Sequence, residues 1–172
     1  MAEQTISDGV DFMTKEVIVE QAQIILEKYK PFGVAGMSLL DKICDEYNII
    51  VEQHMFHNSF NGMLWTKNRQ YYILINCNLC PSRWLFTYAH EVGHWWLHRH
   101  IRGNFFCGPP NGQTYNPVEH EANIFAAELL LPREQILQCL DSGLTVKKIA
   151  RIYRVSEEAA TYRVKELQSR SV

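Results

Sequence analysis

The feature that most constrains this sequence is the pentapeptide His90-Glu91-Val92-Gly93-His94. Two histidines four residues apart on a helix share one face and lie one turn from each other. Both imidazoles can then reach a single Zn²⁺ ion at about 2.0–2.1 Å. Glu91 follows the first histidine by one position, where its carboxylate can accept a proton from water beside the metal. The pattern predicts a hydrolytic zinc site on a helix, with His90 and His94 as ligands and Glu91 as the catalytic base.

The residues around this pentapeptide indicate a buried helix, because they are mainly aromatic and aliphatic: Phe86, Tyr88, Ala89, Trp95, Trp96 and Leu97. Two imidazoles and a carboxylate on a buried helix need partners inside the protein, and a metal ion satisfies them directly. The pentapeptide taken alone is equally compatible with a solvated helix face that carries two ordinary histidines.

A catalytic zinc site needs a third protein ligand and an open position. His98 shares the face but lies two turns from His90, about 12 Å along the helix axis, so we expect it to pack beside the site and not to bind the metal. A second helix supplies the better candidate. Glu121 precedes the apolar Phe125 by one turn and therefore points inward, which predicts Glu121 as the third ligand. The preference for acidic residues near a helix N-terminus is an alternative explanation for both Glu119 and Glu121.

The hydrophobic periodicity predicts an α+β fold. Apolar residues at helical spacing cover residues 14–28, 38–47, 82–102, 117–131, 133–140, 145–153 and 156–168. Segments rich in β-branched and aromatic residues cover 49–55, 60–66 and 70–76, and their close succession favours an antiparallel meander. Residues 103–115 are predicted to form a loop. We expect a core of residues 14–131 with a small three-stranded antiparallel sheet, followed by a small helical appendage of residues 132–172.

Composition narrows the class of protein. Hydrophobic residues make up 47% of the 172 residues and charged residues 21%, which is typical of a globular chain. A formal net charge of −2 means that contact with nucleic acid would need a local basic patch. No apolar run is long enough to span a membrane. The first eleven residues lack the basic residues of a secretory signal, and the five cysteines cannot all pair, so we expect a cytoplasmic protein with reduced thiols. We interpret the C-x-x-C of Cys77 and Cys80 as two unrelated thiols beside a strand.

Two blocks of the sequence resemble the ImmA/IrrE metallopeptidases: residues 86–94, FTYAHEVGH, and residues 121–132, EANIFAAELLLP. The resemblance extends over about residues 38–167. It implies a zincin-like core that binds Zn²⁺ through His90, His94 and Glu121 and uses Glu91 as the base. It also implies an endopeptidase that cleaves a helix-turn-helix repressor and so relieves repression in a mobile element or a stress response.

Hydrolysis of a peptide bond also needs a hydrogen-bond donor for the oxyanion that forms opposite the metal. The candidates in the sequence are Tyr88, Tyr115, His98 and His120. The sequence does not rank these four residues as oxyanion donors or as supports of the metal ligands. It also leaves the substrate's identity and the oligomeric state undetermined.

The C-terminal region has a helix-turn-helix pattern over residues 145–167 and is locally basic. We do not expect it to bind DNA, because Arg154 occupies the turn where glycine is common and no dimerisation helix follows. We expect an appendage that packs on the core or recruits the substrate. The alternative function is a DNA-binding regulator, or one that binds a repressor or a toxin, with a structural metal site.

Overall fold

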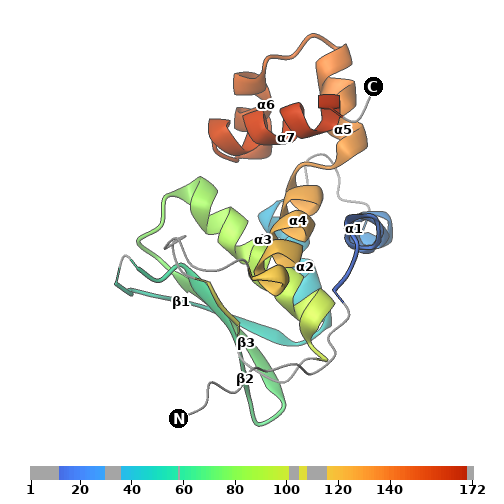
Figure 1. Cartoon of the computed structure of the whole chain (residues 1–172). Helices are drawn as coiled ribbons and strands as arrows, with labels where there is room; N and C mark the ends of the chain where they lie inside the picture. The colour runs from blue at the N-terminus through green and yellow to red at the C-terminus, as the bar shows by residue number, and fades with distance from the viewer. Residues whose placement is uncertain (1–11, 30–35, 58, 101–104, 108–115, 170–172) are drawn as a thin grey trace, which may run out of the picture.

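The computed structural model describes residues 12–29, 36–57, 59–100, 105–107 and 116–169. Its helices are α1 (Lys15–Tyr29), α2 (Met37–Glu46), α3 (Pro81–His98), α4 (Pro117–Leu130), α5 (Arg133–Asp141), α6 (Val146–Tyr153) and α7 (Glu157–Ser169). Its strands are β1 (Ile49–His54), β2 (Gly62–Lys67), β3 (Gln70–Asn76) and the short β4 (Phe105–Cys107). The chain is α+β as predicted, with the sheet on one side of α3 and the other core helices beyond it (Figure 1).

The sheet is mixed, with the strand order β1-β3-β2-β4. β2 and β3 form an antiparallel hairpin, whereas β1 pairs with β3 in parallel, Ile49 lying opposite Tyr71. The predicted antiparallel meander is therefore wrong, since β3 lies between β1 and β2. The buried Asn76 at the end of β3 binds the segment that connects β1 to β2, since its side-chain amide donates to the backbone oxygen of Phe60 at 2.8 Å and to that of His57 at 3.2 Å. The connection between β1 and β2 is thus held across the end of β3.

A second difference concerns residues 103–115, which we predicted to be a loop. Within this segment β4 pairs antiparallel with β2, with Gly62 opposite Cys107. Three residues are too short a run for their alternation to predict a strand. β4 extends the sheet on the side of β2 that is remote from β3.

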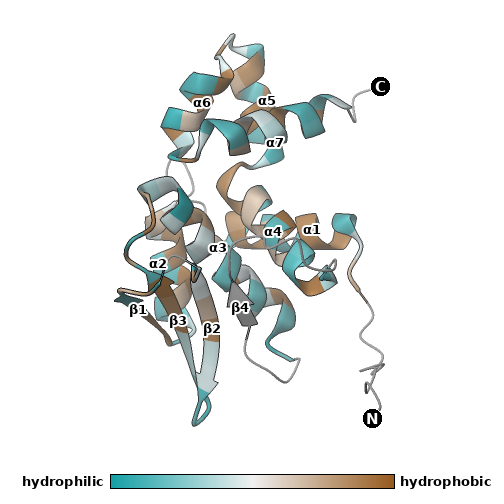
Figure 2. Cartoon of the chain, turned by 60° about the vertical axis from the view of Figure 1, so that its left-hand side comes forward, coloured by the Kyte–Doolittle hydropathy of each residue, from teal (hydrophilic) through white to brown (hydrophobic). Residues whose placement is uncertain are grey.

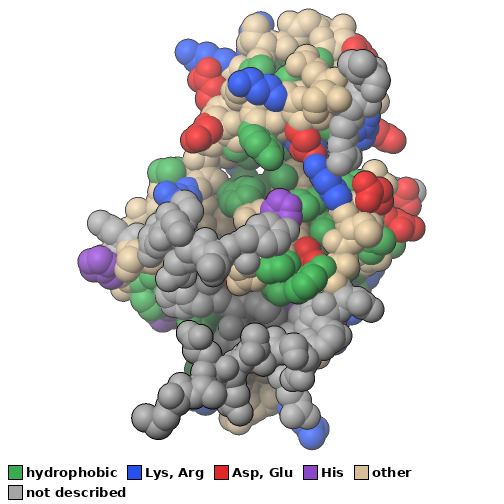
Figure 3. Space-filling view, in the orientation of Figure 1, with side chains coloured by type: hydrophobic (Ala, Val, Ile, Leu, Met, Phe, Trp, Pro, Cys, Tyr) green, Lys and Arg blue, Asp and Glu red, His purple; other side chains and the backbone are tan. Residues whose placement is uncertain are grey.

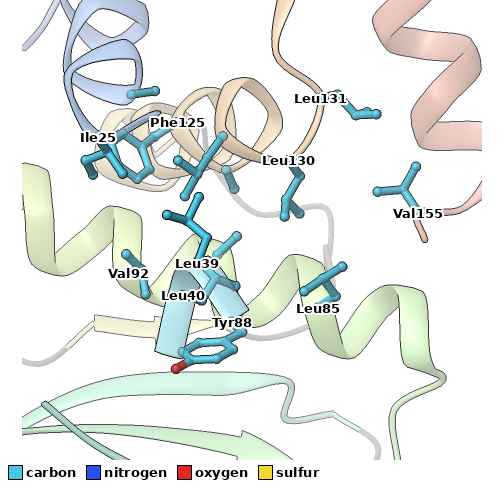
Figure 4. Packing of buried hydrophobic residues seen from close by; sticks show 14 of the residues in the cluster. Ile25, Leu39, Leu40, Leu85, Tyr88, Val92, Phe125, Leu130, Leu131 and Val155 are labelled. Carbon is cyan, nitrogen blue, oxygen red and sulfur yellow. The ribbon is translucent and has the colours of Figure 1, made fainter. Parts of the chain in front are cut away.

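α3 lies in the middle of the core and packs against the sheet on one side and α4 on the other. Figure 4 shows Tyr88 and Val92 of α3 among Leu40 of α2, Phe125 of α4 and Ile25 of α1, all buried. Each large apolar side chain buried in this way contributes about 1.5–3 kcal/mol to folding. Figure 2 shows β3 coloured largely as hydrophobic, and Ile73 and Ile75 of β3 are buried in this core together with Leu129 of α4. α3 is therefore fixed on both sides, which holds its polar residues in place.

α5, α6 and α7 form a helical cluster beyond the end of α4 (Figure 1). Arg163 of α7 joins this cluster to the core, since it is 4% exposed, forms an ion pair with Glu128 of α4 and donates through Nε to the backbone oxygen of Leu131 at 3.0 Å. Glu128 in turn accepts the backbone N–H of Arg133 at the start of α5, at 3.1 Å. In the part of the chain that the structure describes, no helix is long and apolar enough to cross a membrane.

Candidate metal centre

The helical repeat of α3 brings His90 and His94 together as predicted. Their Nε2 atoms are 2.9 Å apart, and the two side chains are 2% and 0% exposed. This face of α3 is therefore not a solvated surface with two ordinary histidines. Two imidazole nitrogens at this separation inside a protein need a shared proton or a shared cation between them.

Glu119, at the start of α4, is the third member of the cluster. Its carboxylate oxygens lie 3.2 Å from Nε2 of His90 and 3.1 Å from Nε2 of His94. Burial raises the pKa of Glu119, whereas hydrogen bonds donated by the imidazoles of His90 and His94 would lower it, to about 2. A positive charge in the cluster, whether a proton or a cation, thus favours the carboxylate form of Glu119. Among the described residues, these three are the group of three or more His, Cys, Asp or Glu side chains whose ligand atoms all lie within 4.8 Å of one another.

The tautomer of His90 is fixed by Asn123, one turn after Glu119 on α4. Nδ1 of His90 lies 3.0 Å from the side-chain oxygen of Asn123. An amide oxygen can only accept a hydrogen bond, so Nδ1 of the neutral ring carries the proton. Nε2 of His90 consequently presents its lone pair to the cluster, which is the form that binds a metal.

The tautomer of His94 is fixed by a longer chain of hydrogen bonds. Nε2 of His98 lies 2.8 Å from Glu121 and must donate, because a carboxylate accepts. Nδ1 of His98 is then an acceptor, and it lies 3.2 Å from Nδ1 of His94, which must be the donor. Burial lowers the pKa of His94 to about 4 and also lowers the pKa of His98, so both rings are neutral. Nε2 of His94 therefore also presents a lone pair to the cluster.

These contacts place Glu121 elsewhere than predicted. We expected Glu121 as the third ligand, but its carboxylate binds His98 and accepts the backbone N–H of Met13 at 2.7 Å, while Glu119 joins the two histidines. Residues two apart on a helix point in directions about 200° different, so Glu119 and Glu121 cannot face the same ion. His98, which we expected beside the metal ligands, does lie there.

The three side chains form a set that fits a divalent cation. Two imidazole lone pairs and one carboxylate oxygen converge, and the hydrogen bonds at the two Nδ1 atoms leave no ring proton to separate them. Two ligands that are each about 2.0–2.1 Å from a tetrahedral zinc ion are about 3.3 Å apart. The observed separations of 2.9, 3.2 and 3.1 Å are close to this value. His90, His94 and Glu119 could hold such an ion, and other divalent metals accept the same donors.

Glu91 lies beside the cluster and is completely buried. Within the described part of the chain, neither of its carboxylate oxygens has a hydrogen-bond partner of normal geometry. Burial, and next the charge of Glu119, raise the pKa of Glu91 well above its usual range, while the backbone amide of Leu64 offsets part of this rise. A Cβ atom on Gly62 would lie 3.0 Å from Oε1 of Glu91, so only glycine lets β2 approach this closely. Glu91 can accept and hold a proton, as a general base requires.

The structure does not bring the other predicted residues to the cluster. The hydroxyl of Tyr88 donates to Asp41 of α2 at 3.1 Å, so it faces away from the histidines. His120 is exposed on α4 and is not part of the three-residue cluster. Tyr115 lies outside the described residues. Cys77 and Cys80 are exposed in the turn before α3 and also lie outside the cluster.

The sequence profile of the IrrE N-terminal-like domain matches residues 44–165, which include both helices of the cluster. The chain belongs to the ImmA/IrrE family. Metallopeptidase ImmA of Bacillus subtilis (strain 168) is 29% identical over 138 residues, covering 78% of this chain and 79% of its own length. An uncharacterized immunity region protein 2 of Bacillus phage phi105 is 32% identical over 148 residues, covering 84% and 87%. The resemblance noted in the sequence is thereby confirmed.

One solved structure shares the fold of this ImmA/IrrE protein. A transcriptional regulator of Mycobacterium tuberculosis superposes with a TM-score of 0.56 at 15% sequence identity. The match covers 86% of this chain but 46% of that chain, so the protein spans about half the length of that relative. At this identity the likeness concerns the fold alone.

Proposed function

We propose that this protein is a zinc-dependent endopeptidase with a zincin-like core, in which His90, His94 and Glu119 bind the metal. The observation that carries the proposal is the convergence of two imidazole lone pairs with one carboxylate, both tautomers being set by hydrogen bonds. Three protein ligands leave a fourth position open, which distinguishes a catalytic zinc site from a structural one. The relative named Metallopeptidase ImmA supports a peptidase, and Zn²⁺ is the metal we expect at such a site.

Glu91 moves the proton in this proposal. Zinc, when bound, supplies Lewis acidity toward the peptide carbonyl and toward water. A carboxylate oxygen of Glu91 takes the proton from the attacking water and holds it, because the buried side chain has a raised pKa. Glu91 then gives the proton to the nitrogen of the leaving amine. Asn123, and His98 together with Glu121, keep the two ligand rings in the orientation that this reaction needs.

The substrate that we propose is a helix-turn-helix transcriptional repressor in the cytoplasm. The family is associated with the cleavage of repressors, and one relative is an immunity region protein of a phage. Cleavage would relieve repression in a mobile element or in a stress response. DNA binding by the C-terminal helices is not proposed, because one of the basic residues that suggested it, Arg163, is buried in an ion pair with Glu128.

The test combines metal analysis with cleavage of the helix-turn-helix protein that is encoded next to this gene. Wild-type protein should bind one zinc ion per chain and cut that protein. Glu91→Gln should keep the zinc and lose at least 100-fold in rate, which is the lower range for a general base. His94→Ala should lose both zinc and activity. Cleavage by Glu91→Gln at the wild-type rate would refute the mechanism, and an intact partner after long incubation with the zinc-loaded wild type would refute this substrate.

A further inference from the structure

A groove of about 640 Å³ lies between the α3–α4 pair and α7. We call it the α4–α7 groove. Figure 3 shows a hollow with hydrophobic side chains between the helical cluster and the core, and Figure 4 shows Leu130, Leu131 and Val155 facing the space between α4 and the C-terminal helices. Its volume is typical of sites that bind a ligand or a short peptide segment. The apolar residues that line it are Phe86, Ala127, Leu130, Leu131, Val155 and Ala159.

The α4–α7 groove reaches Asn123, whose side chain contacts the ring of His90. His94 pairs with Glu119, and His90 pairs with Asn123, so α3 and α4 run antiparallel along one seam. Asn123 is itself part of the groove lining. Phe86 lies on α3 one turn before His90 in the sequence and lines the groove. The centroid of its ring is 6.4 Å from the centroid of the His90 ring. The groove is therefore a continuation of the seam that holds the metal ligands.

The far wall of the groove is fixed to the core. Arg163 of α7 pairs with Glu128 of α4, donates to the backbone of Leu131 and donates to Glu166 at 2.9 Å. These contacts occupy the guanidinium of Arg163, so it cannot select an acidic ligand. Tyr162, on the rim, is 74% exposed, and it is one of the large hydrophobic side chains that the fold leaves in solvent. The lining holds two arginines, Arg83 and Arg163, and two glutamates, Glu158 and Glu166, so it has no excess of either charge and its apolar side chains favour an apolar occupant.

The length of the groove indicates what fits. Its lining reaches from Asn123, beside His90, to Ser82 on α3. His90 and Ser82 are eight residues apart on one helix, or about 12 Å at 1.5 Å per residue. An extended peptide advances about 3.3 Å per residue, so three or four residues fill this distance. A chain lying here would end at Asn123, which contacts the His90 ring.

We propose that the α4–α7 groove binds three or four consecutive apolar residues on one side of the scissile bond of the protein substrate. This inference rests on the proposed peptidase function. It assigns the C-terminal helices a role in selecting the cleavage site, with Tyr162 as a specificity residue. Exposed apolar residues are rare on a folded repressor, so the groove selects a segment that is at least locally unfolded.

The experiment uses a random dodecapeptide library as the probe. Zinc-loaded full-length Glu91→Gln protein is immobilised, and the retained peptides are identified by mass spectrometry. We expect enrichment of Leu, Ile, Val and Phe in a block of three or four positions. Adding Tyr162→Glu should reduce the retention of these peptides about tenfold, as the loss of an exposed aromatic anchor does. The matched control is Gln168→Glu, an exposed position on the same helix outside the groove, which should retain peptides within about twofold.

Wild-type protein is incubated with the same library to separate this inference from the proposed function. Cleavage at a constant distance from the apolar block supports both. Retention of the apolar peptides without cleavage refutes the peptidase function and leaves the groove as a binding site. Cleavage without apolar preference, or equal retention by Tyr162→Glu and Gln168→Glu, refutes substrate binding in the groove.

Ala127→Arg, which fills the groove from α4, provides a second variant if Tyr162→Glu does not fold. A wild-type dimer in sedimentation that Tyr162→Glu dissociates would also refute substrate binding there, since the occupant would then be a second copy.

Discussion

The Nε2 atom of His98 lies 2.8 Å from a carboxylate oxygen of Glu121, and both side chains are buried. The other ring nitrogen of His98 contacts His94, so Glu121 influences His94 through His98. The structure thus separates two acidic residues of α4, since Glu119 contacts His90 and His94 directly and Glu121 contacts His98. This separation can be measured.

Removing Glu121 should weaken zinc binding without abolishing it. Loss of an outer hydrogen-bond partner typically costs 10–100-fold in metal affinity, so we expect this range for Glu121→Ala in competition with a chromophoric chelator. Glu119→Ala should lose far more, and Glu121→Gln should recover part of the affinity because its amide oxygen still accepts from His98. Glu134→Ala is the control, since Glu134 is exposed on α5. If Glu121→Ala abolished zinc binding and Glu119→Ala kept it, the two roles would be reversed.

Gly62→Ala should impair catalysis more than metal binding. The added Cβ would lie 2.6 Å from Cγ2 of Thr87 and 3.0 Å from Oε1 of Glu91, so the catalytic carboxylate or β2 must shift. We expect at least a tenfold lower cleavage rate, unchanged zinc stoichiometry and a loss of about 1–3 kcal/mol in the free energy of unfolding.

Thr87→Ser removes the methyl group with the closest contact and supplies the rescue for Gly62→Ala. The double variant should regain most of the stability but little of the rate, because the contact with Glu91 remains. Thr87→Ser alone serves as the control. A Gly62→Ala protein with wild-type cleavage would show that Glu91 is free to move.

The clustering of His90 and His94 on α3 was predictable because both histidines and Glu91 lie within one short helical motif, where spacing alone sets which side chains share a face. The third member of the cluster was not predictable in this way. We used the inward-pointing Phe125 to orient α4, but the three-residue cluster lies at the seam with α3, where Glu119 and Asn123 match His94 and His90. That match depends on the direction and register of two packed helices, which the periodicity of either sequence does not contain.

The sheet shows the same limit. Segments rich in β-branched and aromatic residues predicted the strands β1, β2 and β3 within a few positions, but this composition cannot tell which strands are neighbours. The buried Asn76 beside the parallel pair β1–β3 binds the backbone of the segment that connects β1 to β2. A single asparagine at the end of a predicted strand carries no sequence signal for this role.

The thiol of Cys44 should make stability fall at high pH. Burial raises its pKa to about 11 from an ordinary value of 9.0, so between these values the unfolded chain releases a proton that the folded chain retains. The contribution is therefore fully present below pH 9 and is lost as the pH rises toward 11, amounting to about 2–3 kcal/mol. Denaturant unfolding of Cys44→Ala should show a shallower decline over this window. An identical decline in wild type and Cys44→Ala would contradict the assignment.

Gly93→Ala should weaken zinc binding by moving α4 away from α3. The added Cβ would lie 3.0 Å from Cδ1 of Phe125 and 3.3 Å from the backbone oxygen of Ala122. The backbone contact cannot be relieved by a side-chain rotation, so α4 must move by a few tenths of an ångström and carry Glu119 with it. Alanine is favoured over glycine within a helix by about 1 kcal/mol, which offsets part of the packing cost of about 1–3 kcal/mol.

We therefore expect Gly93→Ala to unfold at nearly the wild-type temperature without metal, while its zinc affinity falls about tenfold or more. Gly36→Ala is the matched control, because a Cβ there meets no atom within 4 Å among the described residues. Combining Gly93→Ala with Phe125→Leu should recover only part of the zinc affinity, since the contact with Ala122 persists. Chelator competition and thermal unfolding in EDTA measure the two quantities separately. Unchanged zinc affinity in Gly93→Ala would mean that Glu119 reaches the histidines regardless of how closely α3 and α4 pack.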